Sequence, residues 1–140
     1  MLSVFLFAQK AGVSKSSGEA KSTAAGLQPY MESLAKTLKT AAASEDRLKA
    51  GEALAPIQEQ IGLYADAAAT YGSAASLAGV QTLRGQKLLL GSVRCSLSCG
   101  DVSSADFLLS TAFASAADTN IKAAVKLYAL WSWIIKVQTE

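Results

Sequence analysis

The sequence predicts an all-α fold, a bundle of four to five helices in up-down order that is preceded by an N-terminal arm. Apolar residues recur at spacings of three and four along most of the chain, which is the period of a helix face. No stretch of any length alternates apolar and polar residues as a half-buried strand does. At 140 residues the chain fits one domain, which we place at residues 19–140.

The N-terminal residues 1–18 are expected to form either an arm or a targeting segment. Residues 2–8 are apolar, but no basic residue precedes them and no clear cleavage site follows, as a secretory signal would require. In the alternative, Phe5 and Phe7 belong to an ordered arm and dock on the bundle or on a neighbouring molecule. The sequence leaves the compartment open.

The first helix is expected to begin near Glu19 or Gln28 and to end near Ala43. Its apolar positions have helical spacing. They are Leu27, Met31, Leu34 and Leu38. Pro29 fits the first turn of a helix better than its middle, so the strong part of this helix should start there.

The second helix carries the clearest pattern in the chain. Ser44 is its predicted N-cap, and Glu45 and Asp46 follow in the first turn, where the helix dipole favours acids. Seven residues then follow at spacings of three and four: Leu54, Ile57, Ile61, Tyr64, Ala68, Tyr71 and Ala75. This heptad seam is suited to packing at a shallow angle. Pro56 should kink the helix or start it afresh near Leu54.

A third helix is predicted from Ser76 to Ser98, with Gly100 in the position typical of a helix C-cap. Three basic residues form a stripe on it: Arg84, Lys87 and Arg94. Three acidic residues repeat every seven positions before it: Glu52, Glu59 and Asp66. A solvated acidic face is the simplest interpretation. The functional one is that the acidic stripe pairs with the basic stripe, within the chain or on a partner.

The next helix begins with the most specific local signal in the chain. Ser103 and Asp106 have the spacing of a capping box, and Val102 and Phe107 stand at the staple positions. The helix either continues to about Gln138 or breaks at residues 118–120, where cap-type residues cluster, and we favour a break or bend.

The C-terminal segment 121–137 is the sharpest functional candidate. It contains Tyr128, Trp131 and Trp133 among aliphatic residues, so apolar side chains cover most of the helix circumference. A helix of this kind is expected to be buried. It is the central helix of this bundle, a contact with another protein, or a helix that lies on a membrane surface.

The residue types present exclude several kinds of chemistry. Histidine is absent, which excludes Ser-His-Asp and Cys-His catalysis and His-ligated zinc or haem. Cys95 and Cys99 are predicted to be buried free thiols, with a disulfide at a frayed helix end as the alternative. No glycine pattern matches a nucleotide-binding loop. The net charge of +2 is too small to indicate nucleic-acid binding. We therefore expect no cofactor, metal, nucleic acid or small-molecule substrate.

The low content of charged residues indicates that the chain acts by contacting other molecules. Charged residues make up only 17% of the chain, against roughly 25% in average soluble proteins. The deficit indicates either surface buried between chains or an unusually Ala-rich bundle. We expect a non-enzymatic structural or accessory subunit of a larger assembly, whose partners are other protein chains. The candidate contact residues are Phe5, Phe7, Arg84, Lys87, Arg94, Tyr128, Trp131 and Trp133. The alternatives are a peripheral membrane or lipid-binding bundle and a small enzyme that uses carboxylates or a thiolate.

Overall fold

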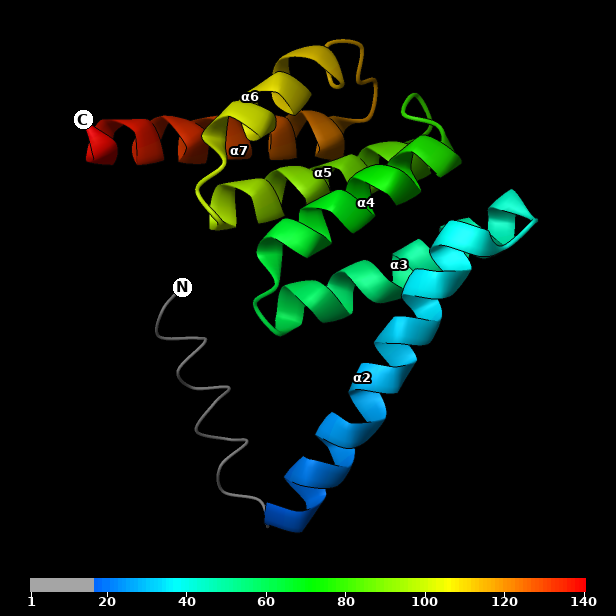
Figure 1. Cartoon of the computed structure of the whole chain (residues 1–140). Coiled ribbons are helices and arrows are strands. Elements are labelled where there is room, and N and C mark those ends of the chain that lie inside the picture. The colour runs from blue at the N-terminus through cyan, green and yellow to red at the C-terminus, as the bar shows by residue number, and fades with distance from the viewer. Residues whose placement is uncertain (1–16) are drawn as a thin grey trace. The chain divides into compact units, whose positions relative to one another are not determined.

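A computed structural model describes the backbone of residues 17–140 and the side chains of residues 26–140 (Figure 1). The predicted contacts of Phe5 and Phe7 lie outside the described residues. The chain divides into two compact units, residues 1–33 and residues 34–140.

The described part is all-α, as the sequence predicts, and contains helices without any strand. Its six helices are α2 (Ser17–Thr40), α3 (Ser44–Gln60), α4 (Tyr64–Ala78), α5 (Leu83–Ser98), α6 (Val102–Thr111) and α7 (Thr119–Thr139). In the second unit, consecutive helices from α3 to α7 alternate in direction (Figure 1). This arrangement is the predicted up-down order.

Helix α2 begins at Ser17, close to the earlier of the two expected starts, and ends at Thr40. Pro29 therefore lies inside the helix and not in its first turn. At the start of α3 the N-cap residue is Ala43, so the prediction for Ser44 is wrong by one position. Glu45 and Asp46 occupy the first turn of α3, as expected.

The predicted heptad seam does not form one helix, because the chain turns between α3 and α4. Gly62 adopts a φ of 85°, which glycine reaches without steric cost. The amide of Gly62 donates to the carbonyl of Glu59 at 3.1 Å, and that of Leu63 donates to Gln58 at 2.8 Å. These two bonds are the Schellman pairing that ends a helix. Pro56, the expected site of a break, lies inside α3.

The predicted third helix also starts later than expected. Ser76 belongs to the end of α4, and the chain turns at Gly79, whose φ is 92°. Thr82 then caps α5 by accepting a hydrogen bond from the amide of Gly85 at 3.0 Å. A Cβ at Gly85 would lie 2.0 Å from the carbonyl oxygen of Gly79, so the turn requires glycine there.

The core of the second unit lies around α5, which packs against α4, α6 and α7. Helix α4 contributes small side chains that are fully buried, Ala67, Ala74 and Ala75. Helix α5 contributes larger ones, among them Leu89, Val93 and Leu97. The small residues allow close approach: a Cβ added at Gly91 of α5 would lie 2.8 Å from the ring of Tyr71 on α4.

The start of α6 differs from the predicted capping box. Gly100 ends α5 with a φ of 82°, as its predicted C-cap role requires. Asp101 is the N-cap of α6, and its carboxylate accepts from the amide of Ser104 at 3.1 Å. Ser103 therefore does not cap this helix, because Asp101 is the residue that precedes its first turn. The break expected at residues 118–120 is present, with Asp118 as the N-cap of α7.

Candidate interaction surface

The acidic and basic stripes meet within the chain, between α3 and α5. Arg84 binds Glu52 at 2.7 Å and Glu45 at 3.3 Å. Arg94 binds both carboxylate oxygens of Glu59, at 2.5 and 2.8 Å. The turn at Gly62 places Asp66 on α4, whereas the other two acids lie on α3. Lys87 is exposed, and neither it nor Asp66 forms an ion pair within the described residues.

Arg94 is the centre of a network that joins α3, α4, α5 and α7. Its guanidinium lies 5.8 Å from the ring centroid of Tyr71 and donates to the hydroxyl of Tyr128 at 3.4 Å. The hydroxyl of Tyr71 donates to Glu59 at 3.0 Å. The hydrogen bond from Arg94 holds the pKa of Glu59 below its ordinary value. Burial, assisted by Glu59, raises the pKa of Tyr71 to about 12.

The ion pairs and the Arg94 network together engage three of the predicted contact residues inside the chain. The charges of Arg84 and Arg94 are paired, and the hydroxyl of Tyr128 accepts a hydrogen bond from Arg94. Tyr128 and Trp131 are both half-buried, with ring centroids 6.2 Å apart. An exposed contact surface of α7 therefore lies on another face of the helix.

One face of α7 packs on the bundle. Ile121 and Ser132 are buried there, and the hydroxyl of Ser132 donates to Asp106 of α6 at 2.6 Å. Lys136 binds the other carboxylate oxygen of Asp106. The hydrogen bond from Lys136, with that from Ser132, lowers the pKa of Asp106. Asp106, expected in a capping box, thus fastens α7 to α6.

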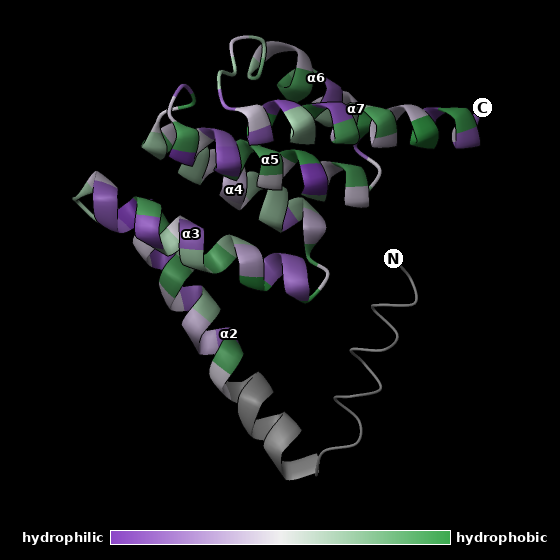
Figure 2. Ribbon diagram, turned by 180° about the vertical axis from the view of Figure 1, so that it is seen from behind, coloured by the Kyte–Doolittle hydropathy of each residue, from purple (hydrophilic) through white to green (hydrophobic). Residues whose placement is uncertain are grey.

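The opposite face of α7 is exposed, which corrects the expectation that this helix is buried all round. Its aliphatic side chains are 41 to 63% exposed. We call these residues the α7 seam: Leu127, Leu130, Ile134 and Val137. Figure 2 shows that apolar residues continue along α7 towards its C-terminal end. The helix is exposed here because α5 and α6 pack on its other side.

Two aromatic side chains flank a groove beside the α7 seam. Trp133 on α7 is 60% exposed, and Phe107 on α6 is 65% exposed. Both line a groove of about 530 Å³ between the two helices. Its other lining residues are Asp106, Leu109, Ser110, Val125, Ala129, Ser132 and Lys136. The structure thus leaves Trp133 exposed among the predicted contact residues of α7.

Sequence reasoning missed Phe107 and the four residues of the α7 seam as contact candidates. A signal was present, because the seam residues follow each other at spacings of three, four and three. That spacing defines one narrow helix face. It was obscured by further apolar residues, such as Trp131 and Ile135, on the other side of the helix.

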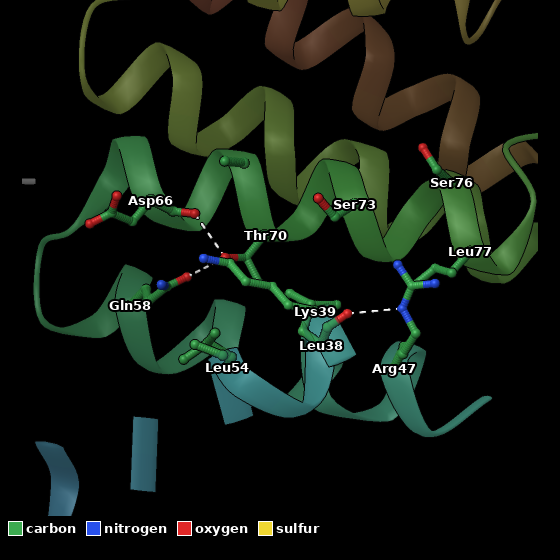
Figure 3. A pocket seen from close by; sticks show the side chains of 12 residues that line it. Leu38, Lys39, Arg47, Leu54, Gln58, Asp66, Thr70, Ser73, Ser76 and Leu77 are labelled. Carbon is green, nitrogen blue, oxygen red and sulfur yellow. Dashed lines mark hydrogen bonds between the residues drawn. The ribbon is translucent and has the colours of Figure 1, made fainter. Parts of the chain in front are cut away.

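A second and larger groove of about 780 Å³ lies between the C-terminal part of α2, α3 and α4 (Figure 3). Several polar groups on its wall bind one another. The hydroxyl of Thr70 donates to Gln58 at 2.7 Å, and Arg47 donates to the carbonyl of Leu38 at 2.9 Å. Asp66 and Lys39 also line the groove. These pairs stabilise the packing of the three helices and give the groove no convergent set of ligand-binding groups.

The two cysteines lie in different environments. Both cysteines are free thiols, and Cys95 is buried. Burial raises the pKa of Cys95 to about 12, so its thiol stays protonated at neutral pH. Cys99 is exposed at the C-cap of α5, contrary to the prediction that both thiols are buried. No group of three metal-ligating side chains occurs in the part of the chain that the structure describes.

None of the described helices combines the length and the hydropathy that crossing a bilayer requires. Comparison with protein-family models, curated proteins and solved structures gives no match.

Proposed function

We propose that this chain is a non-enzymatic helical subunit of a larger protein assembly and that it binds its partner through the exposed face of α7. The observation that carries the proposal is the α7 seam, four aliphatic residues that share one helix face and are 41 to 63% exposed. Contiguous apolar surface of this kind is typical of contact sites, whereas single exposed apolar residues are ordinary.

The composition of this surface supports a protein partner. Aromatic residues are enriched in interfaces and often contribute much of the binding free energy. Trp133 and Phe107 supply two such side chains next to the seam. Covering a half-exposed aliphatic side chain contributes about 1 kcal/mol to the free energy of binding. This value is half of that for burying the whole side chain.

The rigidity of α7 also favours a role in contact. The helix is held on α6 by the bonds of Ser132 and Lys136 to Asp106, and on α5 through Arg94 and Tyr128. Its outer face is thus presented by a helix whose inner face is fixed. A preorganised surface loses less conformational entropy when it binds.

The proposal is tested by comparing the size of the native species in cells that express the full chain. The double variant Leu130→Glu/Ile134→Glu removes apolar area and changes the net charge by −2. The control Lys122→Glu changes the charge equally, at an exposed position of α7 outside the seam. We expect the wild type and the control to elute in a species larger than the 14.5 kDa monomer and the double variant to elute as a monomer. Monomers in all three samples would contradict the proposal.

A membrane surface is the second candidate, because Trp133 and the seam are exposed on a helix that also carries exposed Lys122 and Lys126. An interfacial helix inserts apolar residues between headgroups while its lysines contact anionic lipids. Flotation with anionic vesicles at low salt tests this candidate. Binding that weakens with salt and with Trp133→Ala would support it, and a chain that stays in the soluble fraction would exclude it.

A further inference from the structure

We propose that the partner of the α7 seam is the α7 seam of a second copy of this chain, bound in antiparallel orientation. The inference rests on the proposed function and adds the identity and the direction of the partner.

The seam has the register of a coiled coil. In heptad notation Leu127 and Ile134 occupy a positions, and Leu130 and Val137 occupy d positions. Ser132 is then an f position, opposite the seam, and it is one of the two buried residues of α7, bonded to Asp106 of α6. The heptad assignment and the observed burial thus agree on which side of α7 is free.

Two antiparallel copies of this seam match each other residue for residue. When Leu127 packs against the partner's Val137, Leu130 packs against the partner's Ile134. The same two contacts recur on the other half of the interface, because the pairing is two-fold symmetric. An isologous interface of this kind closes at two subunits.

The flanking residues distinguish the antiparallel from the parallel orientation. Lys126 and Glu140 are g positions, are exposed, and form no ion pair with the described residues. In antiparallel coiled coils g positions lie opposite g positions, so Lys126 meets the partner's Glu140 and Trp133 meets the partner's Trp133. In a parallel pair, g positions face e positions, so Lys126 would face the partner's Trp131 and would gain no acidic partner. Charge complementarity therefore favours the antiparallel pair.

The size of the surface sets the expected affinity. From Leu127 to Val137 the helix rises about 15 Å, which is fewer than three turns. Such a seam buries less area than a standard interface, even with Trp133 and Phe107 at its edge. We therefore expect a reversible dimer with a dissociation constant of about 1–100 μM.

The first experiment measures the mass of the full chain by sedimentation velocity from about 1 μM to about 1 mM, a range that brackets weak interfaces. We expect the mass to rise from monomer to dimer. The variant Leu130→Glu/Ile134→Glu should remain monomeric, while Lys122→Glu should behave like the wild type. Far-UV circular dichroism verifies that each variant stays helical. A wild type that is monomeric throughout would overturn the inference, as would a dimer that the double variant leaves intact.

The second experiment exchanges the charges across the proposed pair. Each single variant, Lys126→Glu or Glu140→Lys, places like charges opposite each other and should weaken dimerisation about tenfold at low salt. The combined variant Lys126→Glu/Glu140→Lys should recover the wild-type affinity. An equal mixture of the two single variants should also recover it, because each then supplies the charge that the other lacks. Failure of both recoveries would overturn the antiparallel register.

The outcomes separate this inference from the proposed function. If the purified chain stays monomeric but the seam variant still loses its larger species in cells, the partner is another protein and only the further inference fails. If Phe5→Ala/Phe7→Ala converts a monomeric chain into a dimer, the N-terminal segment of the same chain occupies the seam, and the further inference is again overturned. If the seam variant changes neither measurement, both fail.

Discussion

The guanidinium of Arg94 on α5 holds both carboxylate oxygens of Glu59 on α3, at 2.5 and 2.8 Å. Two planar groups that meet in this way form a charge-assisted pair of fixed geometry. The pair also has aromatic neighbours, since Tyr71 lies beneath the guanidinium and donates to the same carboxylate. It therefore ties α3 and α4 to the central helix.

Replacing Arg94 by leucine should lower the free energy of unfolding by about 1–3 kcal/mol, between the values for exposed and for buried ion pairs. The loss arises because Glu59 keeps its charge in a half-buried position without its partner. Urea unfolding followed by circular dichroism measures the change. Arg84→Leu is the matched control, and it should cost less because the pair of Arg84 is more exposed. Equal losses for the two variants would contradict this account.

Acid should destabilise the fold through its paired carboxylates. Hydrogen bonds from basic side chains hold the pKa values of three carboxylates below their ordinary values. The pairs are Arg94 with Glu59, Arg84 with Glu52, and Lys136 with Asp106. A carboxylate whose pKa is lower in the folded state stabilises the fold at pH values above its ordinary pKa, which is near 4.5 for glutamate. This stabilisation is lost as the pH falls through the folded-state pKa.

We therefore expect the free energy of unfolding to be nearly constant from about pH 7 to pH 5 and to fall steadily below about pH 4.5. Urea unfolding across this range measures it. Glu59→Gln should be less stable than the wild type at neutral pH and should lose less on acidification, because glutamine does not titrate. A wild type whose stability rises as the pH falls would contradict the assignment of these carboxylates.

The two cysteines should differ in reactivity towards a thiol reagent. Cys99 is exposed, whereas Cys95 is buried and its pKa is raised to about 12. Since the thiolate is the reactive form, we expect one thiol per native chain to react rapidly and the second to react only on unfolding. Cys99→Ser should abolish the rapid phase. A rapid phase that persists in this variant would show that Cys95 is accessible.

Two glycines in the packed helices should respond to alanine in opposite ways. A Cβ at Gly91 would lie 2.8 Å from the Tyr71 ring, so Gly91→Ala should cost about 1–3 kcal/mol as overpacking. At Gly72 the nearest atom, Oγ of Ser92, would be 3.8 Å away, so Gly72→Ala should stabilise the chain by about 0.5–1 kcal/mol through helix propensity. Urea unfolding of both variants tests the pair. Stabilisation by both would contradict the close approach of α4 and α5.

The sequence is sufficient for the fold class and for the start of α7 at its cap residues, because helical periodicity and cap residues are local signals. It does not indicate that α6 already ends at Thr111. It is less informative at Gly62, where one glycine could weaken a helix or end it. The outcome depends on the packing of α3 against α4, which the local sequence does not contain. The same holds for Asp106, whose carboxylate binds Ser132 and Lys136, at 26 and 30 positions further along the chain.

The contact candidates on α7 show a related limit of prediction from sequence. Apolar residues surround this helix in the sequence, and periodicity alone does not state which of its faces the bundle covers. The structure places Tyr128 and Trp131 on the half-buried side and Trp133 on the exposed side. That distinction depends on the position of α5 and α6. By contrast, the regular spacing of both stripes allows their pairing to be proposed from sequence, although a solvated acidic face is the simpler interpretation. The structure shows the pairing for Glu52 and Glu59.

The alanine face of α4 has a consequence for the entropy of folding. Alanine has no side-chain rotamers to lose, whereas fixing a leucine or isoleucine side chain costs about 0.5–1 kcal/mol. Ala67, Ala74 and Ala75 are therefore ordered without that cost, although each removes little apolar area from water. The chain thus places some of its smallest side chains in its core and carries several of its largest aliphatic ones on the outside of α7, where their rotamers remain free.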